Sequence, residues 1–366
     1  MKKIIALICC FCIGFYLAPK SDALAESSKA AVLINAETGE ILFGKNENEI
    51  YPMASTTKIM TALLSLEAGN LDEKFEVDKN AIKVEGTSMG LKEGDRVTLY
   101  ELCVGMLLAS GNDAAGAAAV RVAGSTEAFL TLMNQKATAL GLKNTSFKTP
   151  SGLDSEGHGS TAYDMALLGA AALKNEVFKS ICSQKTAKVC FGQPEIVRTY
   201  YNHNKLLVMD EEIIGVKTGY TKKAGRCLVS AKETDGVTLV AVTLNDKDDW
   251  ETHLSLFDYG FSLVKTDEYK EQRFSLPVAG GKKGTVALKV SAGRISYTGK
   301  EITSKVFLPE FVYAPIGEGE IVGEICFYSG GEKIESAPII TAEAVEQAEK
   351  LNWFQKLLRF LKKLFS

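Results

Sequence analysis

The chain has 366 residues, of which 46% are hydrophobic and 24% are charged, and these proportions are typical of a folded globular protein. They exclude a disordered tail, a collagen-like chain and a polytopic membrane protein. The formal net charge of −3 creates no global positive field, so we expect no nucleic-acid partner. The length predicts two or three domains, each large enough to bury its own core.

The N-terminus has the layout of a secretory signal peptide. Two lysines precede an apolar run over residues 4–18, and Ala23 and Ala25 have the spacing of a cleavage site. An uncleaved membrane anchor is the alternative, but the short apolar run followed by a cleavage site favours removal. We therefore expect residues 1–25 to be a signal peptide and the protein to work outside the cytoplasm.

Five cysteines remain after this segment, and an odd number leaves at least one thiol free or paired between chains. Cys182 and Cys190 are the only pair close in sequence, so they are the candidates for a disulfide. Burial of all five as small apolar side chains is the alternative. The chain has no Cys-x-x-Cys pair and its three histidines are scattered, so we expect no metal site and no cofactor.

Strand-like segments at both ends of a mostly helical stretch predict an α+β domain over residues 26–267. Two hairpins are expected, one from residues 31–34 and 41–43 and one from residues 226–231 and 237–244. Ala-rich segments between the hairpins predict helices at residues 113–123 and 127–140.

After residue 268 the pattern changes to short β-type runs separated by glycine clusters. The runs are residues 285–290, 302–308, 321–328 and 333–340. This spacing predicts a small all-β domain over residues 268–340. It contains no constellation of catalytic side chains, so we interpret it as a spacer or scaffold.

Residues 341–366 are predicted to include an amphipathic helix that binds a membrane surface. From Glu349 onward, the sequence contains five basic residues and one acidic residue, which gives a local charge of +4. On a helical wheel the apolar half contains Trp353, Phe354, Leu357, Leu358, Phe360, Leu361, Leu364 and Phe365. Packing on the β domain and a coiled coil are the alternatives. The apolar arc is wider than a coiled-coil seam, which favours a position in the membrane interface.

The first candidate for chemistry is a serine and lysine pair, Ser55 and Lys58, before an apolar helical run at residues 59–66. The positive end of a helix dipole stabilises a developing alkoxide on such a serine. The spacing of three places both side chains on one helical face, and a lysine kept neutral by burial can act as a base. Alone the pattern is weak, because Ser262 and Lys265 have the same spacing and Ser55 could be a simple N-cap.

Two further triplets strengthen this interpretation. Ser110-Gly111-Asn112 lies between an apolar segment and an Ala-rich helix, where a hydroxyl and an amide can project into a cleft. Lys217-Thr218-Gly219 follows a strand-like segment at residues 213–216 and precedes a turn at residues 220–225. A cation and a hydroxyl at a strand edge suit a peptide carboxylate, and the glycine allows two backbones to approach.

Together the motifs have the order Ser-x-x-Lys, Ser-x-Asn, Lys-Thr-Gly, a set found in penicillin-binding proteins and class A β-lactamases, where the serine is the nucleophile. The chain most resembles the low-molecular-mass penicillin-binding proteins, the D-alanyl-D-alanine carboxypeptidases. The matching segments are residues 51–60, 110–115, 151–154, 162–164 and 216–228. The resemblance spans the chain, because that family also has a signal peptide, a trailing β domain and a C-terminal amphipathic anchor. It implies a β-lactamase/transpeptidase-like domain, an antiparallel sheet with a helical cluster.

The resemblance also implies the catalytic roles. Ser55 attacks the carbonyl between two D-alanines and forms an acyl-enzyme, and Lys58 takes its proton. Ser110 and Asn112 relay a proton to the leaving amine and hold the peptide. The backbone N–H groups of Ser55 and Tyr220 form the oxyanion hole.

The implied substrate-binding residues are Lys217, Thr218, Gly219 and Tyr220, with the first two on the terminal carboxylate. The implied substrates are peptidoglycan stem peptides ending in D-Ala-D-Ala, and β-lactam antibiotics are the implied inhibitors. The enzyme is then expected on the outer face of the bacterial cytoplasmic membrane. Some relatives supply an arginine after the last strand, but residues 245–250 contain none, so carboxylate binding is expected to depend more on Lys217.

Two rival functions remain open at this point. A β-lactamase needs a hydrolytic water held by an added carboxylate, and only Asp154 and Glu156 lie near the right region. A catalytically silent wall-binding protein is the other rival, against which the completeness of the three motifs argues.

Gly90 is a second departure from the family pattern, because a larger side chain is expected there and its loss reshapes the cleft wall.

Overall fold

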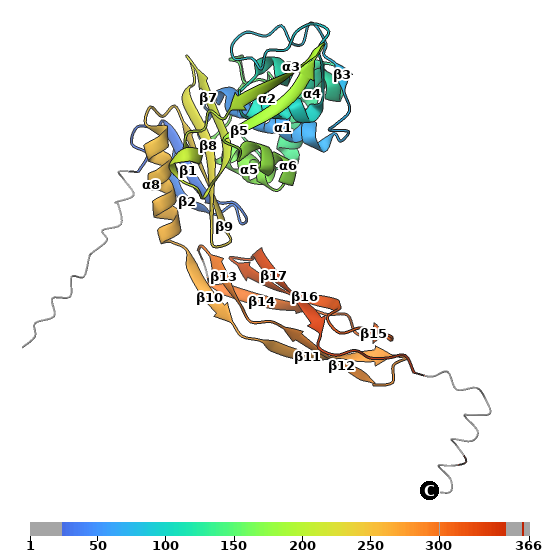
Figure 1. The fold of residues 1–366 in the computed structure, drawn as a ribbon. Coiled ribbons are helices and arrows are strands. Elements are labelled where there is room, and N and C mark those ends of the chain that lie inside the picture. The colour runs from blue at the N-terminus through green and yellow to red at the C-terminus, as the bar shows by residue number, and fades with distance from the viewer. Residues whose placement is uncertain (1–23, 300, 349–360, 362–366) are drawn as a thin grey trace, which may run out of the picture.

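The structure is a computed structural model that describes residues 24–299, 301–348 and 361. Helices surround a five-stranded sheet in a first unit, and a β-rich unit extends from it (Figure 1). This arrangement confirms the predicted α+β fold followed by an all-β domain. Most of the predicted signal peptide and most of the predicted C-terminal helix lie outside the described residues.

The first unit contains a short 3-10 helix and eight α-helices along the described chain. They are η2 (Ala54–Thr57), α1 (Lys58–Glu67), α2 (Leu99–Leu107), α3 (Asn112–Ala123), α4 (Thr126–Ala139), α5 (Ala162–Leu173), α6 (Glu176–Cys182), α7 (Leu206–Met209) and α8 (Asp249–Ser262). Its strands are β1 (Ala30–Asn35), β2 (Ile41–Lys45), β3 (Phe75–Glu76), β4 (Arg96–Val97), β5 (Thr186–Gly192), β6 (Glu195–Tyr201), β7 (Ile213–Thr221), β8 (Gly225–Thr234) and β9 (Val237–Leu244).

The main sheet is antiparallel and has the order β2-β1-β9-β8-β7. Side chains alternate between its two faces, and each face is covered. Val229 and Val242 face the larger core, which includes α1 and α5, whereas Leu228 and Ala241 pack toward α8. The strand β7 has no neighbour on its outer side in this sheet, and this free edge is where the predicted site residues gather.

Both predicted hairpins of this unit and its two Ala-rich helices are present, within a few residues of the expected ends. The main difference concerns β7, which continues to Thr221 rather than ending before Lys217. Seven consecutive register pairs with β8, from Gly215 to Thr221, keep the segment extended, so the whole Lys-Thr-Gly motif lies within the strand. The hairpin of β5 and β6 was not predicted from the sequence.

The second unit has its own core and two sheets. Its strands are β10 (Lys265–Tyr269), β11 (Gln272–Ala279), β12 (Thr285–Val290), β13 (Gly293–Tyr297), β14 (Ile302–Phe307), β15 (Val312–Tyr313), β16 (Ile321–Ser329) and β17 (Glu332–Thr341). The larger sheet has the order β14-β16-β17-β12-β11-β15, and β10 pairs with β13. Residues 342–348, assigned to the anchoring segment from sequence, instead pair with this unit through the contacts of Val345 with Ile316 and of Ala348 with Gly280.

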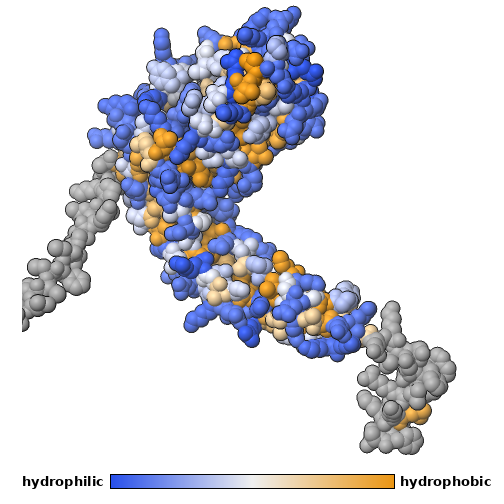
Figure 2. Space-filling model, in the orientation of Figure 1, coloured by the Kyte–Doolittle hydropathy of each residue, from blue (hydrophilic) through white to orange (hydrophobic). Residues whose placement is uncertain are grey.

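The five cysteines of the described chain are all free thiols, and Cys182 and Cys190 form no disulfide. Four of them are buried and Cys190 is half-buried, whereas the alternative interpretation expected all five to be buried. The face of the molecule shown in Figure 2 is largely hydrophilic, with apolar residues in separate groups on both units. Within the described part of the chain, no helix is both long and apolar enough to cross a membrane.

Candidate active site

Ser55 lies in a tightly constrained turn before α1. It belongs to η2, and the preceding residue Ala54 has a φ of +48°, a left-handed conformation that is uncommon for a side chain with a Cβ. Gly152 packs directly against this turn: a Cβ at Gly152 would lie 1.9 Å from the Ala54 carbonyl oxygen. Strained backbone of this kind persists where the surroundings fix it, and here it fixes the position of the serine.

A buried histidine supports the same turn. His158 Nδ1 accepts a hydrogen bond from the Lys148 N–H at 3.0 Å, so the ring proton is on Nε2. Nε2 then donates to Thr57 Oγ1 at 3.0 Å, and Thr57 Oγ1 donates to the Ala54 carbonyl at 2.8 Å. Burial lowers the pKa of His158 to about 4. The histidine is therefore neutral at pH 7 and acts as a structural link.

Lys58 is fully buried and its amine contacts three oxygens. Nζ lies 2.8 Å from Ser55 Oγ, 2.7 Å from Asn112 Oδ1 and 2.7 Å from the Ser151 carbonyl oxygen. The contacts with Asn112 and Ser151 are to oxygens that only accept hydrogen bonds. A neutral amine has two N–H groups and one lone pair, so it can donate to both acceptors and still accept the Ser55 O–H.

The surroundings of Lys58 favour this neutral form. Burial lowers the pKa of Lys58 well below its usual value, the nearby Lys217 lowers it further, and Asp113 opposes the shift. A lysine whose charged form is destabilised in this way can act as a base near neutral pH. The amine of Lys58 thus lies within hydrogen-bond distance of the serine hydroxyl, and its surroundings favour the form that can accept a proton.

The second motif forms the opposite wall of the site. Ser110 has a φ of +58° and precedes α3, which Asn112 begins. The Asn112 amide is fixed because its Nδ2 donates to the Glu85 carbonyl at 2.6 Å, which leaves Oδ1 to face Lys58. The hydroxyl of Thr87 donates to the Ser110 carbonyl at 2.6 Å and ties the loop at residues 85–91 to this wall.

Asp113 binds the same loop, residues 85–91, through its carboxylate. Its carboxylate accepts from the Ser88 hydroxyl at 2.5 Å and from the backbone N–H groups of Met89, Gly90 and Leu91 at 2.8 to 3.0 Å. The space beside Gly90 is filled by Arg198, since a Cβ at Gly90 would lie 3.0 Å from Arg198 Nη1. Arg198 thus occupies the space that a larger side chain at residue 90 would need, and neither Arg198 nor Gly90 is among the residues that line the cleft described below.

The third motif lies on the free edge of the sheet. Gly219 brings β7 against the turn that holds Ser55, because a Cβ at Gly219 would lie 2.9 Å from the Ser55 nitrogen. Lys217 is 1% exposed, and its Nζ donates to the Thr218 carbonyl at 2.8 Å. Burial lowers the pKa of Lys217 to about 7. Tyr220 is exposed at the mouth of the site.

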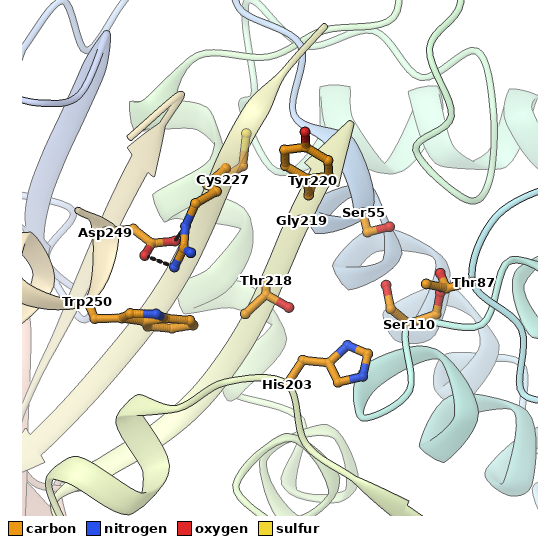
Figure 3. A pocket seen from close by; sticks show the side chains of 11 residues that line it. Ser55, Thr87, Ser110, His203, Thr218, Gly219, Tyr220, Cys227, Asp249 and Trp250 are labelled. Atoms are coloured by element: carbon orange, nitrogen blue, oxygen red, sulfur yellow. Dashed lines mark hydrogen bonds and ion pairs between the residues drawn. The ribbon is translucent and has the colours of Figure 1, made fainter. Parts of the chain in front are cut away.

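These elements enclose a cleft of about 410 Å³. It is lined by Ser55, Thr87, Ser110, His203, Thr218, Gly219, Tyr220, Arg226, Cys227, Asp249 and Trp250. Figure 3 shows the hydroxyl-bearing residues Ser55, Ser110 and Thr218 around one cavity, with Asp249 and Trp250 on the side beyond Thr218. The structure therefore brings residues from all three motifs together around this cleft.

Sequence reasoning missed several cleft residues. Arg226 is the register partner of Tyr220 across β7 and β8, so pairing the predicted strand with its neighbour would have revealed it. Asp249 and Trp250 begin α8, and no motif marks them. Among the described residues, no group of three or more His, Cys, Asp or Glu side chains is arranged to hold a metal ion.

A serine hydroxyl beside a buried lysine amine, open to a cleft along a free strand edge, defines a serine enzyme that acts on peptides. Residues 18–248 match the family model described as D-alanyl-D-alanine carboxypeptidase, and residues 261–347 match that of the C-terminal domain of penicillin-binding protein 5. The chain belongs to the D-alanyl-D-alanine carboxypeptidase family and is a serine-type peptidase.

Individual relatives agree along nearly the whole chain. D-alanyl-D-alanine carboxypeptidase DacF of Bacillus subtilis is 32% identical over 93% of this chain and 91% of its own. D-alanyl-D-alanine carboxypeptidase DacC of Escherichia coli is 34% identical over 89% of this chain and 86% of its own. The structure of penicillin-binding protein 5 from Haemophilus influenzae is similar with a TM-score of 0.62 and 28% identity, over 88% of this chain and 98% of that one.

Proposed function

We propose that this protein removes the terminal D-alanine from peptidoglycan stem peptides that end in D-Ala-D-Ala, with Ser55 as the nucleophile. The observation that carries the proposal is the contact of the buried Lys58 amine with the Ser55 hydroxyl. Membership of the carboxypeptidase family supports the choice of substrate.

In the acylation step, Lys58 Nζ takes the proton from Ser55 Oγ, which attacks the carbonyl carbon of the penultimate D-alanine. The developing oxyanion is stabilised by the backbone N–H groups of Ser55 and Tyr220, an interaction worth about 3 kcal/mol of barrier for one donor. The C–N bond then breaks, the nitrogen of the leaving D-alanine takes a proton relayed through Ser110, and an ester on Ser55 remains. Asn112 holds the Lys58 amine and the peptide during this step.

Deacylation reverses the same chemistry with water. A water molecule loses a proton to Lys58 and attacks the ester carbonyl, and Ser55 Oγ leaves with the proton that the amine returns. β-Lactams carry a strained amide that Ser55 would open in the same way, so they are expected to acylate the enzyme and inhibit it.

The direct test is incubation with a labelled penicillin, followed by mapping of the modified peptide. We expect the label on Ser55 and none in a Ser55→Ala variant, which should also lose hydrolysis of a D-Ala-D-Ala pentapeptide. Ser262→Ala is the matched control, because Ser262 and Lys265 repeat the spacing without the cleft. Unchanged activity of Ser55→Ala would refute the assignment.

The same reagent separates the carboxypeptidase from a β-lactamase. We expect a long-lived penicilloyl-enzyme. Asp154 is one of the two carboxylates that could hold the hydrolytic water of a β-lactamase. Its carboxylate is instead engaged with β7, because it accepts a hydrogen bond from the Thr221 hydroxyl at 3.0 Å. Turnover of the acyl-enzyme in well under a second would contradict the carboxypeptidase assignment.

The location of the protein is also part of this proposal. The signal-peptide pattern of residues 1–25 and the basic amphipathic pattern after Glu349 support export and binding to the outer face of the cytoplasmic membrane. Peptidoglycan, the proposed substrate, lies on that side.

A further inference from the structure

Arg226 is a cation in the cleft that none of the three motifs contains. It lies on β8 opposite Tyr220, and it lines the cleft together with Thr218. Its guanidinium is held on two sides: Nε donates to Asp249 Oδ2 at 3.1 Å, Nη2 donates to Asp249 Oδ1, and Cζ lies 5.1 Å from the centre of the Trp250 ring. The side chain is therefore fixed in place before any ligand arrives.

This guanidinium keeps binding capacity for a second carboxylate. A guanidinium has five N–H groups, and the pairing with Asp249 uses two of them. Asp249 is buried, with 4% of its side chain exposed, whereas 40% of the Arg226 side chain is exposed. The free N–H groups thus belong to the accessible partner of the pair, and that partner borders the cleft.

The charge of Arg226 also differs from that of the other basic groups near the cleft. Lys217 is buried, its Nζ is occupied by its own strand, and burial lowers its pKa to about 7. Partial burial and the nearby Lys217 lower the pKa of His203. An arginine stays protonated at every physiological pH. Among the described residues that line the cleft, Arg226 is the one with a permanent positive charge.

We propose that Arg226 binds the C-terminal carboxylate of the peptide substrate beside Thr218, and that Asp249 and Trp250 are positioning residues that fix its guanidinium. A peptide whose reacting carbonyl lies at Ser55 advances about 3.3 Å per residue along the edge of β7. One residue beyond that carbonyl it reaches the part of the cleft next to Thr218, where Asp249 and Trp250 lie (Figure 3). The inference rests on the proposed function and adds the residue that recognises a free C-terminus.

The test compares two peptides that differ only at the C-terminus: one ends in D-Ala-D-Ala with a free carboxylate, and the other carries a C-terminal carboxamide. We expect the wild-type enzyme to prefer the free acid. In Arg226→Ala, kcat/KM for the acid should fall roughly 10- to 100-fold, the worth of a charge-assisted hydrogen bond, while the value for the carboxamide stays nearly constant. Arg226→Lys should be intermediate, because it keeps the charge and loses the planar donor set.

The chain provides a matched control in Arg121. This arginine also pairs with a carboxylate, that of Glu73 at 2.8 Å, and also lies over an aromatic ring, that of Phe75, but it does not line the cleft. Arg121→Ala should leave the ratio of the two kcat/KM values unchanged. Asp249→Asn should reduce the preference for the free acid without removing it. A purely structural role of Asp249 would instead lower both kcat/KM values equally and leave their ratio unchanged.

The outcomes separate the two proposals. An active Arg226→Ala enzyme that keeps the wild-type preference for the free acid would overturn this inference alone. An equal loss on both peptides would also overturn it, because it would show a structural role for the arginine. A wild-type protein that hydrolyses neither peptide would overturn the proposed function together with the inference.

Discussion

At the scale of single residues, the proposed role of Lys58 as the base can be tested directly by substitution. If its neutral amine is the base, Lys58→Ala should slow acylation by a labelled penicillin by about 10²- to 10⁴-fold, the usual contribution of a general base. Lys58→Arg should be as slow, because a guanidinium cannot give up its proton in a protein. In the wild type, the rate should fall as the pH falls through the lowered pKa of Lys58, since protonation removes the acceptor.

Lys265→Ala is the control for the Lys58 variants, because Lys265 follows Ser262 at the same spacing and lies on β10. The Lys265→Ala variant should be acylated by penicillin at the wild-type rate. Thermal unfolding of each variant reports whether the loss of a buried amine has damaged the fold. A fully folded Lys58→Arg enzyme with wild-type acylation would show that positive charge, and not proton transfer, is the contribution of this residue.

His158 should make the stability of the protein depend on pH. The unfolded chain binds a proton on this histidine near pH 6.5, whereas the native state does so only near pH 4. Between these values the unfolded state holds more protons, so the free energy of unfolding should decrease as the pH falls, by up to about 3 kcal/mol from this group. Urea unfolding at several pH values measures the effect, and His158→Gln should be less sensitive to pH than the wild type.

His203→Gln is the comparison for the stability measurement: burial also lowers the pKa of His203, but this side chain is exposed at the cleft, so its loss should change the slope less than the loss of the buried His158. His253 is also buried, and burial lowers its pKa to about 3, so some pH dependence should remain in His158→Gln. Equal slopes for the wild type and His158→Gln would contradict the assignment of a neutral His158.

At the scale of elements, the site depends on how closely β7 approaches η2, the turn that holds Ser55. A Cβ at Gly219 would lie 2.9 Å from the Ser55 nitrogen and 3.0 Å from the Thr56 nitrogen, which are backbone atoms that cannot rotate away. Gly219→Ala should therefore push the strand edge from η2 and slow acylation by about 10²-fold, as small displacements in catalytic geometry do. Gly284→Ala, at a position with open space, should react at the wild-type rate.

Elements with a regular local signal could be predicted from the sequence, and contacts between distant elements could not. The strand β9 and the helices near residues 113 and 127 have clear periodicity or Ala-rich composition. The three motifs identified Ser55 and its neighbours because each combines reactive groups at fixed spacing. The pairing of Arg226 with Asp249 joins β8 to α8, and neither residue belongs to a motif, so only the folded chain reveals it.

At the scale of the whole molecule, the cleft and one end of the β-rich unit lie apart. The cleft is in the first unit, and Figure 1 shows β12 and β15 in the part of the β-rich unit that points away from it. Ala348 donates to the carbonyl of Gly280, which lies between β11 and β12 in the sequence. The two units also contact each other, since Asn35 Nδ2 donates to Thr298 Oγ1 at 3.0 Å. The role of the β-rich unit as a spacer between the site and a C-terminal anchor stays a prediction.

This layout leads to the last prediction, that the C-terminal segment binds membranes without contributing to catalysis. Deletion of residues 349–366 removes the predicted amphipathic helix and a charge of +4. We expect the truncated protein to remain in the supernatant when mixed with anionic vesicles, whereas the full chain sediments with them, and raised salt should weaken its binding.

Acylation of the truncated protein by penicillin should proceed at the rate of the full chain, because every residue lining the cleft lies between Ser55 and Trp250. A full chain in which Phe354, Leu357 and Leu361 are replaced by serine keeps the charge and loses apolar surface. If apolar burial dominates binding, this variant should also stay in the supernatant. Sedimentation of the truncated protein with vesicles would contradict the anchor, and a change in acylation would contradict the separation of the site from it.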